Sequence, residues 1–198
     1  MLQKIKNALI SVSDKTDLLD VLKTLKKYKI NIISSGGTYL AIKKFGFECT
    51  EVSKYTGFKE MLDGRVKTLH PKIHAGILHD RQNKKHQNEM TEKNFPAIDL
   101  ILVNFYPFQK IVTSTSNAKN IIENIDIGGP TMVRAAAKNF NNVTIVTSKN
   151  DYSNLIEEIN KNKGATTLTF RELMSSKAFG LTAYYDAMIA NWFNKKLN

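Results

Sequence analysis

Short apolar runs alternate with leucine-rich segments of helical spacing in the N-terminal part of the chain, and this alternation restricts the possible folds most. Residues 8–12 form an apolar run, and Ser13-Asp14 after it gives a helix-start signal before leucines at 18, 19, 22 and 25. A second apolar run at residues 30–33 precedes Ser-Ser-Gly-Gly-Thr and a short helical pattern that ends at Gly46. This order predicts a parallel sheet, because parallel neighbours need a crossover helix between them.

Further patterns extend this alternation to the end of the chain. Additional strands are predicted at residues 48–52, 98–103 and 143–147, the middle one as a strand buried on both faces. Gly129-Pro130 predicts a helix start before residues 131–138, and Thr169 to Glu172 matches a capping box that opens a long helix towards Trp192. Residues 82–94 are predicted to form an exposed, partly helical excursion. The fold class is therefore predicted as α/β, doubly wound, with a mainly parallel sheet flanked by helices.

Length and composition restrict the class of protein. A chain of 198 residues with 42% hydrophobic residues suits one domain over residues 1–198. No signal peptide and no apolar run near the roughly 18 residues of a membrane span occur, and the single Cys49 fits a reducing compartment, so a cytoplasmic protein is expected. The net charge of +11 raises the question of nucleic acid, but only four arginines occur and the lysines are spread along the chain, which disfavours that partner.

Two polar loops follow the first two predicted strands. In open α/β sheets ligands bind beyond the carboxyl ends of the strands, so both loops should line one crevice. Glycines let backbone N–H groups approach an anion, hydroxyls donate hydrogen bonds, and a lysine supplies positive charge, which together suit a phosphate. Ordinary tight turns are the alternative interpretation. The residues concerned are Ser11, Ser13, Lys15, Ser35, Gly36, Gly37 and Thr38.

Three more segments carry polar groups that could meet a ligand. Residues 63–71 set a guanidinium, an ammonium, a hydroxyl and an imidazole in a stretch without helix or strand period, for which a solvated basic loop is the alternative. Asn104 and Tyr106 follow the predicted strand at residues 98–103, and Asp126 precedes the Pro130 helix. His70 and His74 have the spacing of a metal pair, but without a third ligand in sight no metal site is predicted. No Gly-x-Gly-x-x-Gly and no Ser-His-Asp set is present.

The order of six motifs resembles the inosine monophosphate (IMP) cyclohydrolase domain of the bifunctional purine-biosynthesis protein. The two longest motifs, at residues 56–71 and 125–139, carry most of the resemblance. The others are Ser-Val-Ser-Asp-Lys-Thr, Ser-Gly-Gly-Thr, His-Ala-Gly-Ile-Leu and Asn-Phe-Tyr-Pro-Phe. Asp17 and Phe105 depart from the family pattern, although neither removes a reacting group. The resemblance implies a methylglyoxal-synthase-like (MGS-like) fold. It also implies ring closure of 5-formamidoimidazole-4-carboxamide ribonucleotide (FAICAR) to IMP with loss of water, without metal or organic cofactor.

The resemblance also implies roles for individual residues. Lys67 would stabilise developing oxygen charge, and Tyr106, Asp126 and Lys138 would orient groups or transfer protons, with Asp126 and Lys138 as a coupled pair. Which of these two removes the carboxamide proton is left open. The implied substrate-binding residues are Ser11, Ser13, Lys15, Thr16, Ser35, Gly36, Gly37, Thr38, Arg65, Thr68, Asn104, Ile127, Gly128 and Gly129.

The resemblance further implies a homodimer that binds FAICAR and IMP, and whether the partner subunit supplies some site residues is left open. Neither a membrane nor a nucleic acid is expected as a partner. The family's formyltransferase domain is not expected in this chain, which would be either an excised domain or a separate gene product. Two other functions remain open. A methylglyoxal synthase would share the phosphate loops but would not need residues 65–71 and 126–138. A non-catalytic regulatory domain that binds a nucleotide would not need Lys67, Tyr106, Asp126 and Lys138 together.

Overall fold

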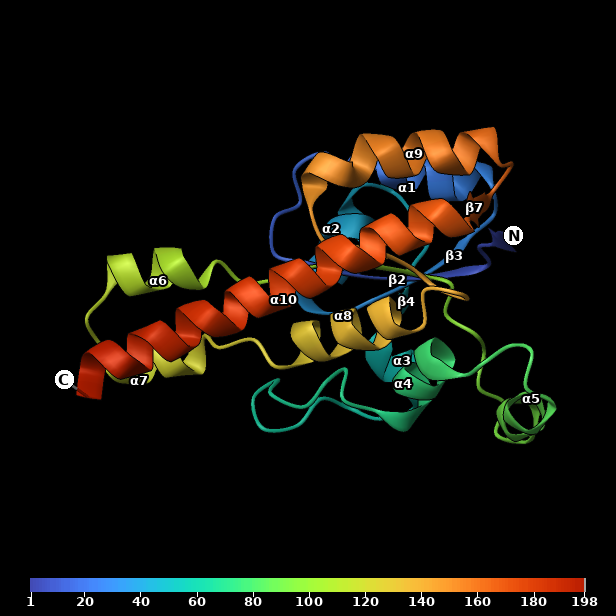
Figure 1. Ribbon diagram of the computed structural model, residues 1–198. Coiled ribbons are helices and arrows are strands. Elements are labelled where there is room, and N and C mark those ends of the chain that lie inside the picture. The colour runs from blue at the N-terminus through green and yellow to red at the C-terminus, as the bar shows by residue number, and fades with distance from the viewer. Residues whose placement is uncertain (198) are drawn as a thin grey trace.

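A computed structural model describes residues 1–197 and shows a parallel β-sheet between helical layers (Figure 1). The sheet has the strand order β4-β3-β2-β5-β6, and every neighbouring pair is parallel. The predicted α/β class and all five predicted strands are confirmed, although the strand ends differ by a few residues. Asn198, the last residue of the predicted single domain, lies outside the described residues. The strands are β2 (Asn7–Val12), β3 (Asn31–Ser34), β4 (Thr50–Glu51), β5 (Leu100–Asn104) and β6 (Thr144–Val146).

The chain winds outwards from the middle of the sheet in both directions. It starts at β2, moves through β3 to β4, and then returns to the other side of β2 for β5 and β6. Because crossovers between parallel strands are right-handed, this reversal puts helices on opposite faces (Figure 1). The predicted doubly wound arrangement is therefore confirmed. On one face lie α1 (Leu18–Lys27), α2 (Gly36–Lys44) and α9 (Tyr152–Lys161), and on the other lie α3 (Val52–Thr56), α4 (Pro71–Leu78) and α8 (Gly128–Lys138).

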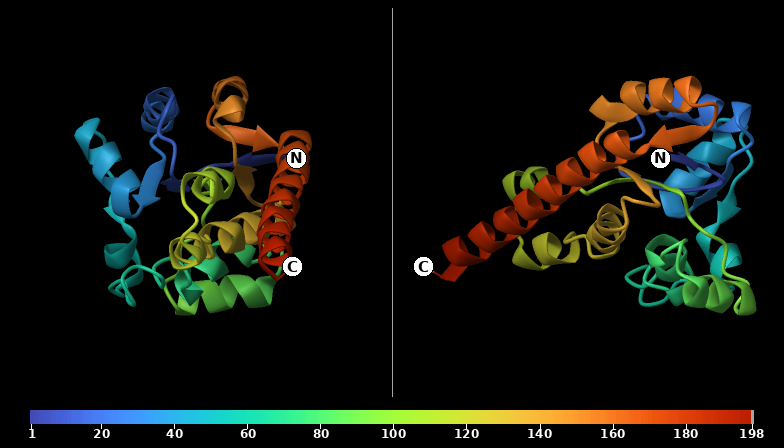
Figure 2. Two further views of the ribbon diagram at one scale, coloured as in Figure 1. Left: turned by 90° about the vertical axis from the view of Figure 1, so that its left-hand side faces the viewer. Right: turned by 45° about the vertical axis from the view of Figure 1, so that its right-hand side comes forward.

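Several elements lie outside these layers, and among them the sequence predicted only the long C-terminal helix and the excursion at residues 82–94. A second, two-stranded sheet forms where β1 (Leu2–Lys4) pairs antiparallel with β7 (Ala165–Thr167). The long helix α10 (Leu168–Leu197) packs on α8 and β6 and continues beyond the sheet towards two short helices, as the views in Figure 2 show. The exposed helix at residues 84–92 confirms the predicted excursion. The short elements are α5 (Lys84–Glu92), α6 (Phe108–Ser114), α7 (Ala118–Glu123) and the 3-10 turn η1 (Lys149–Asp151).

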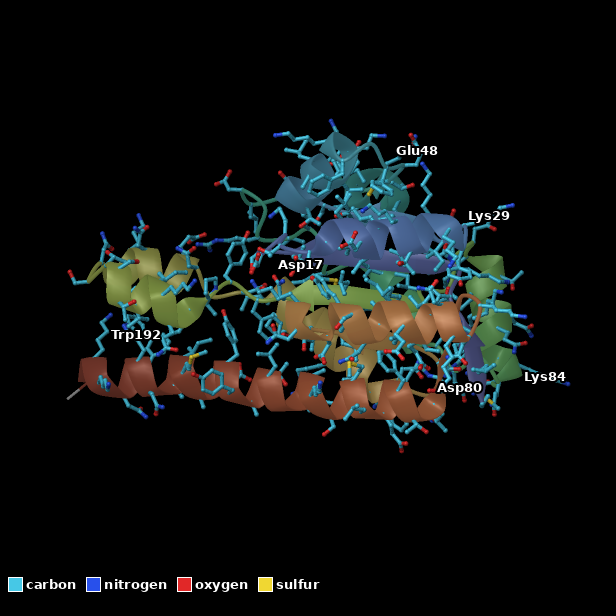
Figure 3. All side chains as sticks on the ribbon, turned by 90° about the horizontal axis from the view of Figure 1, so that it is seen from above. Asp17, Lys29, Glu48, Asp80, Lys84 and Trp192 are labelled. Carbon is cyan, nitrogen blue, oxygen red and sulfur yellow. The ribbon has the colours of Figure 1, made fainter. Side chains whose placement is uncertain are left out.

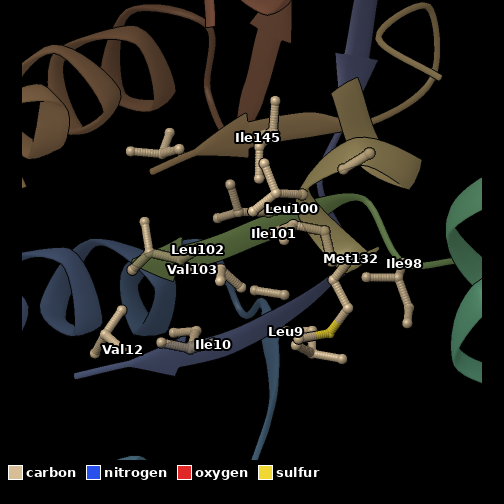
Figure 4. Close-up of a cluster of buried hydrophobic side chains, with 14 of the residues drawn as sticks. Leu9, Ile10, Val12, Ile98, Leu100, Ile101, Leu102, Val103, Met132 and Ile145 are labelled. Atoms are coloured by element: carbon tan, nitrogen blue, oxygen red, sulfur yellow. The ribbon is translucent and has the colours of Figure 1, made fainter. Parts of the chain in front are cut away.

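The core lies between the central strands and the helices that cover them. Leu9 and Leu102 are fully buried on neighbouring strands, and Met132 from α8 packs against the same cluster (Figure 4). Burial on both faces explains why these strands are almost continuously apolar. Charged side chains such as Lys29 and Lys84 point outwards at the periphery (Figure 3). The large positive charge is thus a property of the surface.

Two predicted helix starts are wrong by a few residues. The first helix begins at Leu18 rather than directly after Ser13-Asp14, because Asp17 adopts a left-handed conformation with φ 61°. The capping box predicted from Thr169 is replaced by a cap at Thr167, whose Oγ1 accepts a hydrogen bond from Phe170 N at 3.2 Å. Arg171, part of the predicted box, is instead fully buried inside the protein.

Candidate active site

The main cavity opens at the carboxyl ends of β2, β3 and β5. The winding direction reverses at β2, which has β3 on one side and β5 on the other. The volume of the cavity is about 710 Å³, which suits a nucleotide-sized ligand. This is the position at which doubly wound sheets bind ligands. The polar loops predicted to share a crevice therefore do so. The predicted residues that line the cavity are Ser11, Ser13, Lys15, Ser35, Gly36, Gly37, Thr38, Arg65, Lys67, Thr68, Asn104, Tyr106, Asp126, Ile127, Gly128 and Gly129.

One end of the cavity is built to bind an anion. The N-terminus of α2 begins at Gly36, which has φ +54°, a conformation that glycine adopts without strain. Two ammonium groups flank this helix end. Lys67 Nζ lies 3.3 Å from the position of a Cβ atom added at Gly36, and Lys15 Nζ lies 4.0 Å from one added at Gly37. Free N–H groups of a helix start, together with two cations, favour a phosphate.

Asn104, at the end of β5, holds the polar loop that follows β2. Its Oδ1 accepts hydrogen bonds from Ser13 N at 2.6 Å and from Ser13 Oγ at 2.8 Å, while its Nδ2 donates to Asp14 O at 3.3 Å. These contacts occupy the carboxamide, so Asn104 holds the loop in shape more than it offers groups to a ligand. Lys15 Nζ, in turn, donates to Val12 O and Ser13 O, which keeps its ammonium over the same loop.

Thr38 has a structural role that the sequence did not indicate. Its hydroxyl donates to Val12 O at 2.9 Å and accepts from Val12 N at 3.0 Å, and the residue is 4% exposed. The side chain therefore joins the end of β2 to α2. In its predicted phosphate-binding role, Thr38 can offer its backbone N–H.

The first part of the polar segment at residues 63–71 lies in a hairpin at the cavity wall. Met61 and Val66 pair as an isolated antiparallel bridge, and the tip between them holds Leu62, Asp63 and Gly64 at positive φ. Arg65 on this hairpin forms an ion pair with Glu123 at the end of α7. The predicted polar segment thus faces the cavity, as expected for a ligand-binding loop.

Asp126 also lines the cavity, beside the start of α8. Its backbone N donates to Tyr185 Oη at 2.8 Å, and its Oδ1 accepts from Gly129 N at 2.9 Å. Burial raises the pKa of the Asp126 carboxyl above its ordinary value, although the Gly129 hydrogen bond opposes this effect. A carboxyl group with a raised pKa at a cavity wall is a candidate for proton transfer.

The two glycines at the start of α8 make room for side chains of the cavity wall. A Cβ atom at Gly128 would come within 2.6 Å of Thr68 Oγ1, and one at Gly129 would come within 2.4 Å of Asp126 Oδ2. These two glycines were predicted to bind substrate, and their lack of a Cβ lets the side chains of Thr68 and Asp126 lie against the start of α8. Thr68 itself is 7% exposed, so its hydroxyl is held in a tight place.

Gly129→Ala should therefore destabilise the protein, because the added methyl group pushes against the Asp126 carboxylate. We expect the free energy of unfolding to fall by about 1–3 kcal/mol, the usual cost of overpacking. Gly180→Ala is the matched control, since Gly180 lies in α10 with no atom within 4 Å of an added Cβ. That control should gain about 0.5–1 kcal/mol from better helix propensity. Urea unfolding measures both, and an equal change in the two variants would contradict the crowding at Gly129.

Two predicted site residues do not line the cavity. Thr16 is exposed, and its N and Oγ1 both donate to Asp14 Oδ1 in a local turn. Lys138 lies at the last position of α8, whereas Asp126 precedes its first, so about 16 Å of helix separates them. Lys138 lines a separate cavity of about 490 Å³ with Arg134 and Phe179. Within one copy of the chain, Asp126 and Lys138 therefore do not meet.

Other cavity residues were missed by the sequence analysis. Glu123 is the most important of them, because its carboxylate holds Arg65. It ends α7, which the sequence analysis did not predict. Asn117 was the available signal, since its side chain accepts a hydrogen bond from Asn120 N as a helix N-cap.

The structure also places the histidines that were considered for a metal. Pro71 is the first residue of α4, so His74 lies in a helix while His70 caps it by accepting a hydrogen bond from Lys72 N. Among the described residues, His, Cys, Asp and Glu form no group of three or more that could hold a metal ion. Within residues 1–197, none of the helices has the length and apolar character that a membrane span requires.

Comparisons with known proteins agree with this geometry. Residues 17–131 match the family described as MGS-like domain, and residues 136–198 match the family described as AICARFT/IMPCHase bienzyme. A protein of Bradyrhizobium diazoefficiens named "Bifunctional purine biosynthesis protein PurH" is 48% identical over 98% of this chain and 37% of its own length. A relative of the same name from Rhizobium johnstonii is 46% identical over 98% of the chain and 36% of its length. The chain thus spans little more than a third of these relatives.

A solved structure covers the same extent as the chain. The structure titled "Crystal structure of ForH" superposes with a TM-score of 0.85 and 29% identity, over 96% of this chain and 99% of the other. The predicted MGS-like fold is confirmed by the family match and by the parallel sheet with its flanking helices.

Proposed function

The chain belongs to the MGS-like domain family, and from this premise we propose that it closes the ring of FAICAR to give IMP and water. It would therefore be an enzyme of purine biosynthesis, acting in the cytoplasm. The match of residues 136–198 to the AICARFT/IMPCHase family supports this proposal, and so do the relatives named PurH. One observation carries it. A single cavity joins an anion-binding helix end, with Lys15 and Lys67, to the half-buried Asp126 carboxyl.

The reaction needs positioning and proton transfer. The carboxamide nitrogen bonds to the formyl carbon and loses one proton, the formamido nitrogen loses a second, and the formyl oxygen leaves with both as water. Holding the ribose phosphate at α2 fixes one end of the substrate, so that the two reacting groups meet inside the cavity. The substrate-binding groups would be the two polar loops, with Arg65 and Thr68 at the hairpin wall.

Asp126 is proposed to accept the carboxamide proton. The sequence left the choice between Asp126 and Lys138 open, and the place of Lys138 outside this cavity favours Asp126. Its raised pKa brings the carboxyl closer to working pH, where a general base is most efficient. Tyr106, which is 56% exposed and lines the cavity, would donate to the formyl oxygen as negative charge develops on it. The resemblance implies the same role for Lys67, but its ammonium lies beside the start of α2 and is proposed here to bind the phosphate.

We expect a homodimer, as the resemblance implies. Lys138 and Arg134 share one face of α8 away from the main cavity. Lys138 would act in this reaction only if a second copy of the chain brought it to the cavity. The proposed roles of Lys15, Lys67 and Asp126 do not depend on that arrangement.

Lys15→Ala tests the phosphate end of the cavity. Loss of its ammonium should weaken IMP and ribose 5-phosphate binding by about ten- to a hundredfold, the range for hydrogen bonds to charged groups. Lys23→Ala on α1 is a control of equal charge, because Lys23 pairs with Asp20 on the exposed helix surface. Isothermal titration measures the affinities. Unchanged affinity in Lys15→Ala would remove Lys15 from the phosphate site.

The activity itself is tested by absorbance, with purified protein and FAICAR in the absence of metal and folate. We expect formation of IMP by the wild type. Dihydroxyacetone phosphate should give no methylglyoxal in a parallel assay, and conversion of that triose phosphate instead of FAICAR would favour a methylglyoxal synthase.

A further inference from the structure

Lys67, one of the two cations at the anion-binding helix end, is already bound to a carboxylate of its own loop. Its Nζ lies 2.5 Å from Glu60 Oε2, and the two side chains are 29% and 54% exposed. Glu60 was not singled out by the sequence, and it has no role in the proposed reaction. Its contact with a cavity cation therefore needs an explanation.

The hairpin fold itself sets this contact. Met61 N donates to Val66 O at 3.0 Å and Val66 N donates to Met61 O at 3.2 Å, so these two residues face each other. The next residues outward on the two arms are Glu60 and Lys67, which are therefore brought opposite each other. Opposite charges at such facing positions attract. The register of the hairpin thus makes Glu60 the ion-pair partner of Lys67.

The same ammonium also belongs to the anion site. It lies 3.3 Å from where a Cβ at Gly36 would stand, at the first residue of α2. A phosphate bound at this helix start and the Glu60 carboxylate would be two anions beside one ammonium. Two like charges at close range repel, and only one of them can have the best position on the cation.

We propose that Glu60 competes with the phosphate of the ligand for Lys67 and thereby limits how tightly the ligand binds. Ligand entry exchanges one ion pair for another, and ligand departure restores the first. Glu60 is an affinity-setting residue in this account, and it favours release of product. The inference rests on the proposed function, because it takes the ligand to be a phosphorylated ribonucleotide.

Glu60→Gln should accordingly tighten binding of both IMP and inorganic phosphate by about two- to fivefold, the range for a partly exposed ion pair. Isothermal titration at low salt measures the dissociation constants, and the gain should shrink as salt screens the charges. Asp20→Asn is the matched control, because it removes a carboxylate from the exposed Lys23 pair and changes the net charge equally. That control should leave both constants unchanged.

A double variant decides whether the effect passes through Lys67. In a Lys67→Gln background, the further change Glu60→Gln should give no gain in affinity. A gain that persists there, an equal gain in Asp20→Asn, or weaker binding by Glu60→Gln would each overturn the proposal.

The two probes separate this inference from the proposed function. If the wild type binds inorganic phosphate but not IMP, the proposed function fails, while the ratio of phosphate constants still decides the role of Glu60. If IMP binds and Glu60→Gln has the same dissociation constants as the wild type, only the proposed role of Glu60 fails.

Discussion

Asp126→Asn is expected to lower kcat for ring closure by about 10²–10⁴-fold, the usual contribution of a general acid or base. The asparagine keeps the size of the side chain and an oxygen that can accept from Gly129 N, so the start of α8 should stay intact. IMP affinity should change little, because the anion end of the cavity is untouched. Steady-state kinetics on FAICAR together with IMP titration measure the two effects. A loss of affinity as large as the loss of kcat would contradict a role in proton transfer.

The same variant should be more stable than the wild type at neutral pH. Burial raises the pKa of Asp126, so the folded protein keeps this proton at pH values where the unfolded chain has released it. The stability from this group is full below the ordinary pKa of 3.8 and is lost as pH rises through the raised value. Removing the charge should therefore raise the urea midpoint at pH 7, and the gain should shrink as pH falls. A lower midpoint at pH 7 would mean that the loss of kcat reflects misfolding.

Asp99→Asn should lower the free energy of unfolding by about 3–5 kcal/mol, the usual cost of breaking a buried ion pair. Asp99 is 3% exposed, and its Oδ1 lies 2.7 Å from Arg81 Nη1. Its Oδ2 accepts from Lys6 N at 2.7 Å and from Asn7 N at 2.8 Å, which ties the start of β2 to the residue before β5. An asparagine has one oxygen and one NH2 group in place of the two carboxylate oxygens. Its NH2 group would therefore face either Arg81 or the backbone N–H groups of Lys6 and Asn7, all of which are donors. Urea unfolding measures the loss.

A double-mutant cycle shows whether the ion pair causes this loss. Arg81→Met alone should also be strongly destabilising, and the double variant should lose less than the sum of the two single changes. Asp20→Asn, which breaks an exposed pair on α1, should cost at most about 1 kcal/mol. Simple additivity of Asp99→Asn and Arg81→Met would show that the two side chains act independently.

The sequence predicted the sheet well because four of its strands, β2, β3, β5 and β6, are mostly buried. Short apolar runs such as residues 8–12 and 30–33 are typical of buried parallel strands, and the helices between them imply the direction in which the chain winds. The β1–β7 pair was missed because Leu2–Lys4 and Ala165–Thr167 are too short to show a period. Buried charges were missed for another reason. Asp99 fell inside a predicted strand, and Arg171 looked like part of a helix cap, yet both bind backbone groups that only the fold brings near.

The candidate site was predictable where a loop directly follows a strand. Ser13 and Gly36 follow strand ends and Asn104 is the last residue of β5, and parallel strands bring those ends to one edge of the sheet. Motif order grouped Lys138 with Asp126, but it does not say how far apart a helix holds them within one copy of the chain. The predicted helix already implied the separation from Asp126. The ion pair of Lys67 with Glu60 depends on the hairpin register, and that of Arg65 with Glu123 depends on α7. The sequence analysis predicted neither the hairpin nor α7.

The proposed ring closure is tested most directly by one experiment on the purified chain. FAICAR is added without metal or folate, and the products are separated and identified by mass at successive times. We predict that the wild type converts FAICAR to IMP with loss of one water, that Asp126→Asn binds IMP but converts FAICAR at least about a hundredfold more slowly, and that Glu60→Gln remains active. A folded wild-type protein that binds IMP yet leaves FAICAR unchanged would contradict the proposal and would favour a regulatory nucleotide-binding domain.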